Sequence, residues 1–285
     1  MKVAILGTEN SHADAFLDLI LHDPDFSEIE LVGIYGYDDD ANNRLIEKGF
    51  KGTVADNPHE FLGKVDAVLV TARHGDHHYE YALPYVEAGI PAFIDKPFCV
   101  DLNKAEALVA AAKKSGAPLS GGSSIRFLNE WEDFPEFIKN NEVVGATVTA
   151  PVNMVNEYGG YYFYSQHLAE TMVHIFGENA KSVIAYCPDE KENRITAIYD
   201  YGEFDITAHY YKSYAYSVSV YTVEGGVKSA FTYNGGGAYK KELAEFYEMA
   251  KTGVMPMSFE RLLKPLKILH ATEESFKSGK RVVIE

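Results

Sequence analysis

Residues 65 to 97 read VDAVLVTARHGDHHYEYALPYVEAGIPAFIDKP, in which two apolar runs flank one segment with helical spacing. The first run, Val65–Thr71, is nearly continuous, which is typical of a strand covered on both faces. His77–Ala88 predicts a helix that ends at a glycine, although Pro84 within it should kink that helix or shift its start. Pro91–Ile94 is the second apolar run. The order strand, helix, strand predicts two parallel strands joined by a crossover helix.

The same alternation extends on both sides of this stretch. Further strands are expected at Lys2–Leu6, Glu30–Tyr35, Thr53–Val54 and Pro118–Ser120, and further helices at Ser11–His22, Asn42–Lys48, Pro58–Leu62 and Asn103–Lys114. These repeated units predict an α/β Rossmann-type domain with a parallel sheet over residues 1–121. In such a sheet, ligands bind beyond the carboxyl ends of the strands.

The pattern changes after Arg126, where long runs rich in β-branched and aromatic residues follow one another. Strands are expected at Ala146–Asn156, Ser182–Tyr186, Ile195–Tyr199, Phe204–Tyr211, Tyr216–Val223, Gly226–Tyr233 and Arg281–Ile284, and helices at Glu132–Asn140, His167–Phe176, Lys240–Lys251 and Phe259–Lys277. We therefore predict that residues 122–285 form an α+β domain with an open, mostly antiparallel sheet. Its final helix and strand are free to pack back on the first domain.

The composition narrows the class of protein. The net charge of −16 argues against a nucleic-acid or anionic-membrane partner, because both need basic patches. Cys99 and Cys187 are the only cysteines, too few for a disulfide framework. No run approaches the roughly 18 apolar residues of a membrane span, and the start lacks the features of a signal peptide. We therefore expect a soluble cytoplasmic protein with a small-molecule substrate.

The second predicted domain is rich in tyrosine. The chain has 20 tyrosines, most of them after Gly145 and many in strand-like runs. A sheet face that exposes such side chains would be a liability in a monomer. We therefore expect a homodimer or homotetramer formed through the C-terminal sheet.

The turn after the first strand reads Gly7-Thr8-Glu9-Asn10-Ser11-His12. A dinucleotide fingerprint has three glycines at such a turn, whereas this one has only the first. A diphosphate can still bind the helix N-terminus with hydrogen bonds from neighbouring side chains, although Glu9 would repel it. Asn and Ser are also good N-cap residues, so a helix cap and a phosphate site are compatible alternatives. The candidate cofactor-binding residues of this turn are Gly7, Thr8, Asn10, Ser11 and His12.

Two further turns carry candidate cofactor residues. Asp38, after the second strand, is the nearest carboxylate that could hold the adenine-side ribose, although a solvated acidic turn explains it as well. A carboxylate there would repel a 2′-phosphate, so Asp38 favours NAD over NADP. Thr71, Ala72 and His74 follow the fourth strand and join the candidate cofactor site because that strand also ends at the ligand-binding edge.

The segment Arg73-His74-Gly75-Asp76-His77-His78 also raises a metal hypothesis, because imidazole and carboxylate both bind zinc. Its spacing matches no standard zinc motif, and adjacent histidines on a helix point in different directions. We therefore predict no metal site. Metal-assisted chemistry at His74, Asp76 and His77 remains an alternative.

The run Ile94-Asp95-Lys96-Pro97-Phe98 places a lysine just past a buried strand. Pro97 prevents Lys96 from continuing that strand. A lysine at the open edge of the sheet can hydrogen-bond a substrate hydroxyl and favour loss of its proton. The alternative is a surface lysine paired with Asp95. We predict that Lys96 is catalytic and that both residues line the cofactor site.

Residues 65–127 resemble the Gfo/Idh/MocA family, named after glucose–fructose oxidoreductase, inositol dehydrogenase and a rhizopine catabolism protein. The matching features are a helix start with His78 and Ala82, Asp95-Lys96-Pro97 where the family has Glu-Lys-Pro, and Arg126-Phe127. The run RLLKPLKILHATEESFKSGKRVVI near the C-terminus also resembles the family's closing helix and strand. The resemblance covers nearly the whole chain.

This resemblance implies a site on a second-domain helix. The family has Asp-x-Gly-x-His there, with a second acid three residues on. Here the run is Phe163-Tyr164-Ser165-Gln166-His167, followed by Glu170. His167 matches the family's catalytic histidine and Glu170 its second acid, whereas Phe163 and Ser165 replace the aspartate and the glycine. Arg126, Tyr158, Tyr164 and Glu170 are the candidate substrate-binding residues.

The resemblance also implies a function. It predicts an oxidoreductase that uses NAD or NADP to transfer hydride to or from a sugar-like or polyol substrate. His167 would be the general base and Lys96 would stabilise the developing oxyanion. The missing glycines and the loss of the family aspartate at Phe163 motivate an alternative: a relative without dehydrogenase activity that binds a sugar or another metabolite.

Overall fold

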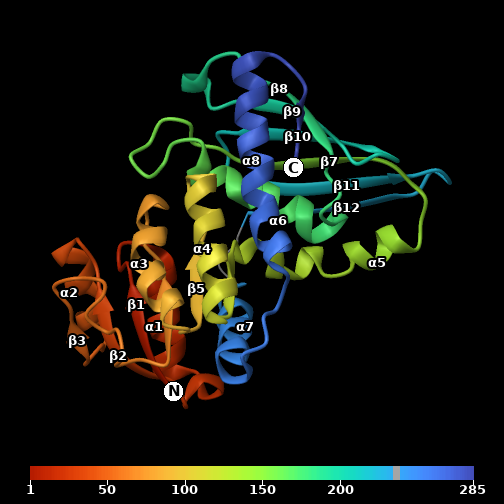
Figure 1. Cartoon of the computed structure of the whole chain (residues 1–285). Coiled ribbons are helices and arrows are strands. Elements are labelled where there is room, and N and C mark those ends of the chain that lie inside the picture. The colour runs from red at the N-terminus through yellow and green to blue at the C-terminus, as the bar shows by residue number, and fades with distance from the viewer. Residues whose placement is uncertain (234–237) are drawn as a thin grey trace. The chain divides into compact units, whose positions relative to one another are not determined.

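The computed structural model describes residues 1–233 and 238–285 (Figure 1). These residues form two compact units. The first contains Met1–Gly122 and Tyr239–Leu262, and the second contains the described residues of Ser123–Ala238 together with Leu263–Glu285. The division after residue 122 lies one residue from the predicted boundary. Residues 239–262, which the sequence placed in the second domain, belong to the first unit.

The first unit has the predicted Rossmann-type sheet. Its strands are all parallel and lie in the order β3-β2-β1-β4-β5-β6. The strands are β1 (Lys2–Leu6), β2 (Glu30–Tyr35), β3 (Thr53–Val54), β4 (Ala67–Val70), β5 (Ala92–Asp95) and β6 (Leu119–Gly122). The helices are α1 (Ser11–His22), α2 (Asp39–Glu47), α3 (Asp76–Glu87), α4 (Leu102–Ser115) and α7 (Tyr239–Thr252), with a 3₁₀ turn η1 (Pro24–Phe26). The predicted α/β fold of this part is confirmed.

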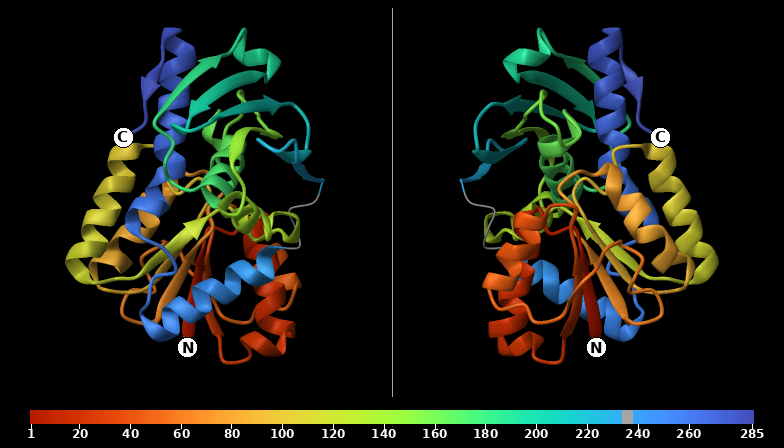
Figure 2. Two further views of the ribbon diagram at one scale, coloured as in Figure 1. Left: turned by 90° about the vertical axis from the view of Figure 1, so that its right-hand side faces the viewer. Right: turned by 90° about the vertical axis from the view of Figure 1, so that its left-hand side faces the viewer.

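Helix α7 joins the first unit because its apolar face fits a core that the N-terminal residues form. Leu243, Phe246 and Met249 are buried in one cluster with Phe16 of α1 and Phe93 of β5. Burying a side chain of this size contributes about 2 kcal/mol relative to leaving it exposed. Figure 2 shows α7, in light blue, beside the N-terminal strands in both views.

Two local predictions for the first unit were wrong. The expected helix at Pro58–Leu62 is a series of turns, in which the side chain of Asn57 accepts from the backbone N–H of His59. Local side-chain bonds of this kind compete with a helix. The second helix begins at Asp39 rather than Asn42, because Asp38 caps it. Pro84 lies within α3, which runs through it.

The second unit has the predicted open sheet, with strands in the order β12-β11-β7-β10-β9-β8-β13. The pairs are antiparallel except β7 with β10. Its strands are β7 (Val143–Pro151), β8 (Ser182–Tyr186), β9 (Ile195–Asp200), β10 (Asp205–Tyr211), β11 (Tyr216–Thr222), β12 (Val227–Thr232) and β13 (Val282–Val283). Its helices are α5 (Phe134–Lys139), α6 (Tyr162–Phe176) and α8 (Phe259–Ser278, from Leu263 onward), with 3₁₀ turns η2 (Ser124–Phe127), η3 (Asn129–Trp131) and η4 (Glu190–Glu192).

Three predictions for this unit need correction. β7 ends at Pro151 rather than Asn156, whose side chain instead makes a local turn with the backbone of Asn153 and Gly160. Helix α6 begins at Tyr162, so Phe163 and Tyr164 lie on the helix. The last strand, β13, pairs with β8 in the second sheet rather than packing on the first domain.

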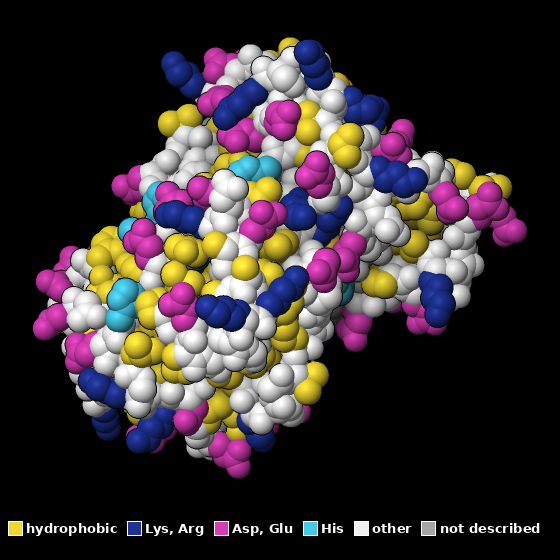
Figure 3. Space-filling model, in the orientation of Figure 1, with side chains coloured by type: hydrophobic (Ala, Val, Ile, Leu, Met, Phe, Trp, Pro, Cys, Tyr) yellow, Lys and Arg dark blue, Asp and Glu magenta, His cyan; other side chains and the backbone are white. Residues whose placement is uncertain are grey.

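Helices α6 and α8 cover one face of the second sheet. α6 packs on β7, and Thr272 of α8 hydrogen-bonds the hydroxyl of Tyr199 at 2.8 Å. No helix in the described part of the chain is long and apolar enough to cross a membrane. On the surface drawn in Figure 3, acidic side chains are spread among the lysines and arginines.

Candidate active site

The turn after β1 is held against the turn after β4. The backbone N–H of Gly7 donates to the carbonyl of Tyr35 at 2.6 Å, and the hydroxyl of Thr71 donates to the carbonyl of Gly7 at 2.6 Å. Gly7 has φ +105°, and a Cβ there would lie 2.1 Å from the backbone nitrogen of Ala72. Only glycine fits this close approach of two backbones.

The polar side chains of the first turn have partners that sequence reasoning did not predict. Thr8 is buried and donates its hydroxyl proton to Asn42 at 2.8 Å. Asn10 is the N-cap residue of α1, yet its side chain makes no cap bond and donates to Asp95 at 2.5 Å instead. The hydroxyl of Ser11 lies 3.2 Å from that of Tyr239 in α7. Asn10 therefore does not cap α1 with its side chain.

The turn after β2 binds the carboxylate of Glu9, whereas the carboxylate of Asp38 caps a helix. Asp38 caps α2 by accepting from the backbone N–H of Asp40 at 2.9 Å. Glu9 Oε1 accepts from the backbone N–H of Tyr37 at 2.8 Å, and Glu9 Oε2 is buried with no hydrogen-bond partner among the described residues. Burial raises the pKa of Glu9. This contact could not be predicted from a local sequence pattern, because Glu9 and Tyr37 are 28 residues apart.

Aromatic rings gather beside Glu9. His77 stacks on Tyr81 at 5.4 Å with an interplanar angle of 9°, and its ring also lies 5.6 Å from that of Tyr37. His74 packs edge-on against His77 and accepts from the backbone N–H of Asp76 through Nδ1. Within residues 1–233 and 238–285, no group of three or more His, Cys, Asp or Glu side chains is arranged to hold a metal ion.

His78 joins the turns after β4 and β5. Its ring is fully buried, with Nδ1 2.7 Å from the carbonyl of Pro97 and Nε2 2.8 Å from the carbonyl of Ala72. The ring therefore ties the residues that follow Lys96 to the turn that packs on Gly7.

Lys96 lies at the carboxyl end of β5 and is only 6% exposed, so it is not a surface lysine. Its backbone N–H donates to Asp95 Oδ1 at 2.7 Å, and Asp95 is completely buried. Burial lowers the pKa of Lys96, and the nearby Asp95 charge opposes that shift. His12 Nδ1 lies 3.2 Å from the other oxygen of Asp95.

In the second unit, His167 lies on α6 and is 9% exposed. Its Nδ1 is 2.6 Å from the hydroxyl oxygen of Ser123, which also accepts from the backbone N–H of Ile125. The rings of Tyr164 and Tyr216 lie 6.0 and 5.7 Å from it. The sequence pointed to residues 121–126 as functional candidates because they follow a strand, but it assigned no role to Ser123.

The other predicted substrate residues also lie in the second unit. Arg126 Nε and Glu170 Oε1 are 3.9 Å apart, and both side chains are buried. Phe163, which replaces the family aspartate, packs between the rings of Tyr158 at 5.2 Å and Tyr164 at 4.8 Å. An apolar ring thus fills a position where the family resemblance implied a charge.

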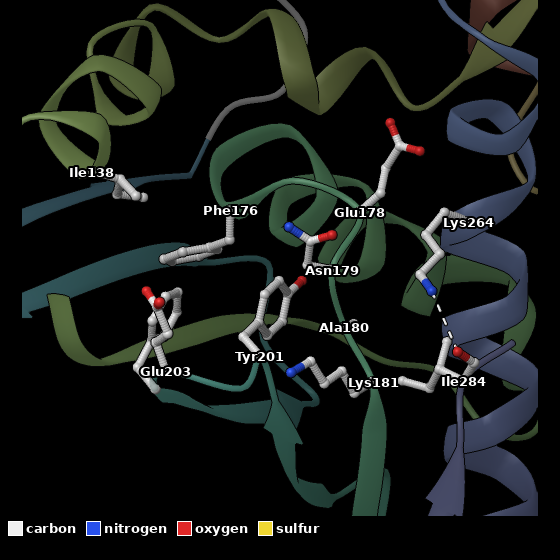
Figure 4. A pocket seen from close by; sticks show the side chains of 11 residues that line it. Ile138, Phe176, Glu178, Asn179, Ala180, Lys181, Tyr201, Glu203, Lys264 and Ile284 are labelled. Atoms are coloured by element: carbon white, nitrogen blue, oxygen red, sulfur yellow. Dashed lines mark hydrogen bonds between the residues drawn. The ribbon is translucent and has the colours of Figure 1, made fainter.

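A separate cavity of about 560 Å³ in the second unit contains none of the predicted site residues. Figure 4 shows Lys181 and Tyr201 among its lining residues, and Lys264, whose Nζ is 3.5 Å from the carbonyl of Ile284. Acidic and basic side chains both line it. Because both kinds of charge line the cavity, its lining does not favour one class of ligand.

Residues 1–123 match the family model described as an oxidoreductase family with an NAD-binding Rossmann fold. A myo-inositol dehydrogenase from Streptomyces leeuwenhoekii is 36% identical over 85 residues, which cover 30% of this chain and 26% of that protein. The alignment thus spans about a quarter of this curated relative.

Two solved structures share the fold. The myo-inositol 2-dehydrogenase of Lactobacillus plantarum has a TM-score of 0.87 at 14% identity, covering 100% of this chain and 99% of that one. The WlbA dehydrogenase of Bordetella pertussis, in complex with NADH and UDP-GlcNAcA, has a TM-score of 0.85 at 15% identity and covers 100% and 98%. Residues 1–123 of the chain thus match the Gfo/Idh/MocA oxidoreductase family model, and the solved structures share the fold of the whole chain.

Proposed function

We propose that this protein is a nicotinamide-dependent oxidoreductase that transfers hydride between NAD and a CH–OH group of a sugar-like or polyol substrate. The observation that carries the proposal is Lys96, a buried cation at the carboxyl end of β5, in a domain of a family that binds NAD. The similarity to inositol dehydrogenases supports a polyol as the substrate class.

The first unit has features that fit a dinucleotide. Helix α1 has no side-chain cap, so its first backbone N–H groups suit a diphosphate, and the Gly7 turn keeps the backbone close. Thr71, Ala72 and His74 line the adjoining turn. Bound there, the cofactor would supply the hydride acceptor or donor.

Glu9 supports NAD rather than NADP. Its buried Oε2 is an acceptor without a donor among the described residues, which suits a ribose hydroxyl. A 2′-phosphate in its place would meet a carboxylate in a region of low dielectric. Asp38 would have served the same purpose, but it is used as a helix cap.

His167 and Lys96 have the chemistry that the reaction needs. If Nδ1 of His167 donates to Ser123, Nε2 keeps its lone pair and can take the carbinol proton. A lysine whose ammonium is desolvated stabilises a developing alkoxide strongly, because the interaction is not screened by water. Arg126, Tyr158, Tyr164 and Glu170 would orient the substrate.

One observation favours the second candidate function, a metabolite-binding protein without dehydrogenase activity. Phe163 is packed into an aromatic cluster, so an apolar ring occupies the position of the family aspartate. Calorimetry separates the two functions. We expect NAD or NADH to bind and myo-inositol or another polyol to yield NADH, whereas the absence of cofactor binding at millimolar concentration would favour the second function.

We also propose that the protein is a homodimer or homotetramer through the second sheet. By strand register, Tyr186, Ile198, Tyr211, Tyr221 and Phe231 lie on the face opposite the one that α6 and α8 cover. They are 37 to 67% exposed. A face that exposes several large aromatic and aliphatic side chains suits an interface between copies of the chain.

A further inference from the structure

Glu242 is a buried acid on α7 that the sequence analysis did not single out. It is 1% exposed, and its Oε2 lies 3.2 Å from Nε2 of His12. The other ring nitrogen of His12 lies 3.2 Å from Oδ2 of Asp95, and Asp95 precedes Lys96. Glu242, His12 and Asp95 thus form a line of contacts that leads from α7 to Lys96. All four residues belong to the first unit.

The line must hold an extra proton. A neutral imidazole has one N–H and one lone pair, so between two carboxylates it would repel one of them. Two arrangements avoid this: an imidazolium between two carboxylates, or a neutral ring between one carboxylate and one protonated carboxyl. Both contain the same number of protons, and both leave one unit of negative charge beside the Lys96 ammonium.

The surrounding groups favour the neutral ring. Burial raises the pKa of Asp95, whereas the bonds that it accepts from the side chain of Asn10 and the backbone of Lys96 favour its carboxylate form. Burial lowers the pKa of His12 to about 4. In this arrangement the N–H of the His12 ring lies at Nδ1 and faces Asp95, and Nε2 faces Glu242. The charge of Arg73 also acts on Lys96, and the hydroxyl of Tyr239 lies within electrostatic reach of Asp95 and Glu242.

A structural role for Glu242 alone is a poor explanation. Leu243, Phe246 and Met249 already anchor α7 in the core. Burying an acid and an imidazole costs several kcal/mol of desolvation, and apolar residues of similar volume often stabilise a fold better. The burial of Glu242 and His12 is better explained if these two residues hold Asp95 and Lys96 in place.

We propose that Glu242 and His12 are positioning residues for Lys96, acting through Asp95. The ring of His12 stands where a dinucleotide fingerprint has its third glycine, and it is packed edge-on against Tyr239 at 4.7 Å and Phe16 at 5.7 Å. Fixed there, it keeps Asp95 from turning away and holds the start of the Lys96 turn. This inference rests on the proposed role of Lys96 in catalysis.

The test combines a rescue with a double-mutant cycle. Glu242→Gln keeps a neutral donor toward His12, whereas Glu242→Ala leaves none. With myo-inositol and NAD, we expect Glu242→Ala to lower kcat about tenfold with the KM for NAD nearly unchanged, and Glu242→Gln to keep activity within about threefold of wild type. Glu248→Ala, on the exposed side of the same helix, should match wild type.

In the Lys96→Met background, Glu242→Ala should have no further effect, because both changes act through one group. Equal losses in the two backgrounds, or a Glu242→Gln variant as damaged as Glu242→Ala, would overturn the proposal. Thermal midpoints of all variants identify any that fail to fold.

A second readout does not need turnover. In ¹⁵N spectra, we expect His12 to stay neutral with its proton on Nδ1 between about pH 5.5 and pH 8, and to lose that fixed tautomer in Glu242→Ala but not in Glu242→Gln. A His12 that titrates near its ordinary pKa would contradict the inference. If no polyol is oxidised while the spectra behave as expected, the proposed function has failed and the positioning line has not.

Discussion

The backbone N–H of Tyr37 donates to Oε1 of Glu9 at 2.8 Å, which fixes a carboxylate from the first turn at the end of the second strand. Its second oxygen is buried without a partner among the described residues. Two turns that are far apart in the sequence thus build one acceptor, at the position where a Rossmann domain holds the adenine-side ribose.

Glu9→Gln should weaken the preference for NAD over NADP. The amide keeps an oxygen for the Tyr37 N–H but removes the charge that repels a 2′-phosphate. We expect the ratio of NAD to NADP affinities to fall about tenfold, which corresponds to about 1.4 kcal/mol, as measured by calorimetry. Asp38→Asn is the matched control because Asn also caps a helix. A larger change in the affinity ratio for Asp38→Asn than for Glu9→Gln would show that Asp38, not Glu9, discriminates between NAD and NADP.

Lys96→Met should abolish most turnover while leaving cofactor binding intact. The loss of a cation that stabilises the oxyanion lowers kcat by about 10²- to 10³-fold in comparable sites. NADH binding, followed by its fluorescence, should change by less than about threefold. Full turnover by this variant on an accepted substrate would remove Lys96 from the mechanism.

Ser123→Ala should impair His167 as a general base. The hydroxyl oxygen 2.6 Å from Nδ1 holds the orientation of the ring, and if Nδ1 donates to it, Nε2 keeps the lone pair that a general base needs. We expect kcat to fall about tenfold and the pH–rate profile to change on its acid limb. Ser124→Ala, a change at the neighbouring buried serine, serves as the control. An unchanged profile in Ser123→Ala would show that His167 does not depend on this bond.

Phe231→Glu should disrupt the association of subunits. Phe231 is 65% exposed on the uncovered face of the second sheet, and burying a carboxylate in an apolar interface costs several kcal/mol. Light scattering should give a smaller mass for the variant than for wild type. Glu203→Gln, in the turn between β9 and β10, should keep the wild-type mass. A wild-type protein that is monomeric would refute the proposed interface.

The alternation of apolar strands and amphipathic helices was enough to predict the Rossmann-type fold and the open second sheet. Such patterns are local, because the period of buried residues is set by the strand or helix itself. The same logic located Lys96 at the end of a strand, where parallel sheets bind ligands. Helix α7 was also predicted within a residue at each end, but it was assigned to the wrong domain. An amphipathic pattern says which face is buried and not what covers it.

Only the tertiary structure decided which polar groups meet. Glu9 reaches Tyr37 over 28 residues, Ser123 reaches His167 over 44, and Glu242 comes from α7 to His12. No periodicity encodes these pairs, because each depends on where two separate elements bring their side chains. The sequence by itself determined the scaffold and the lysine at its ligand-binding edge. The packed structure determined that Asp38 caps a helix and that Glu9 binds the backbone of the turn after β2. It also determined that His12 is buried between Glu242 and Asp95, the residue before Lys96.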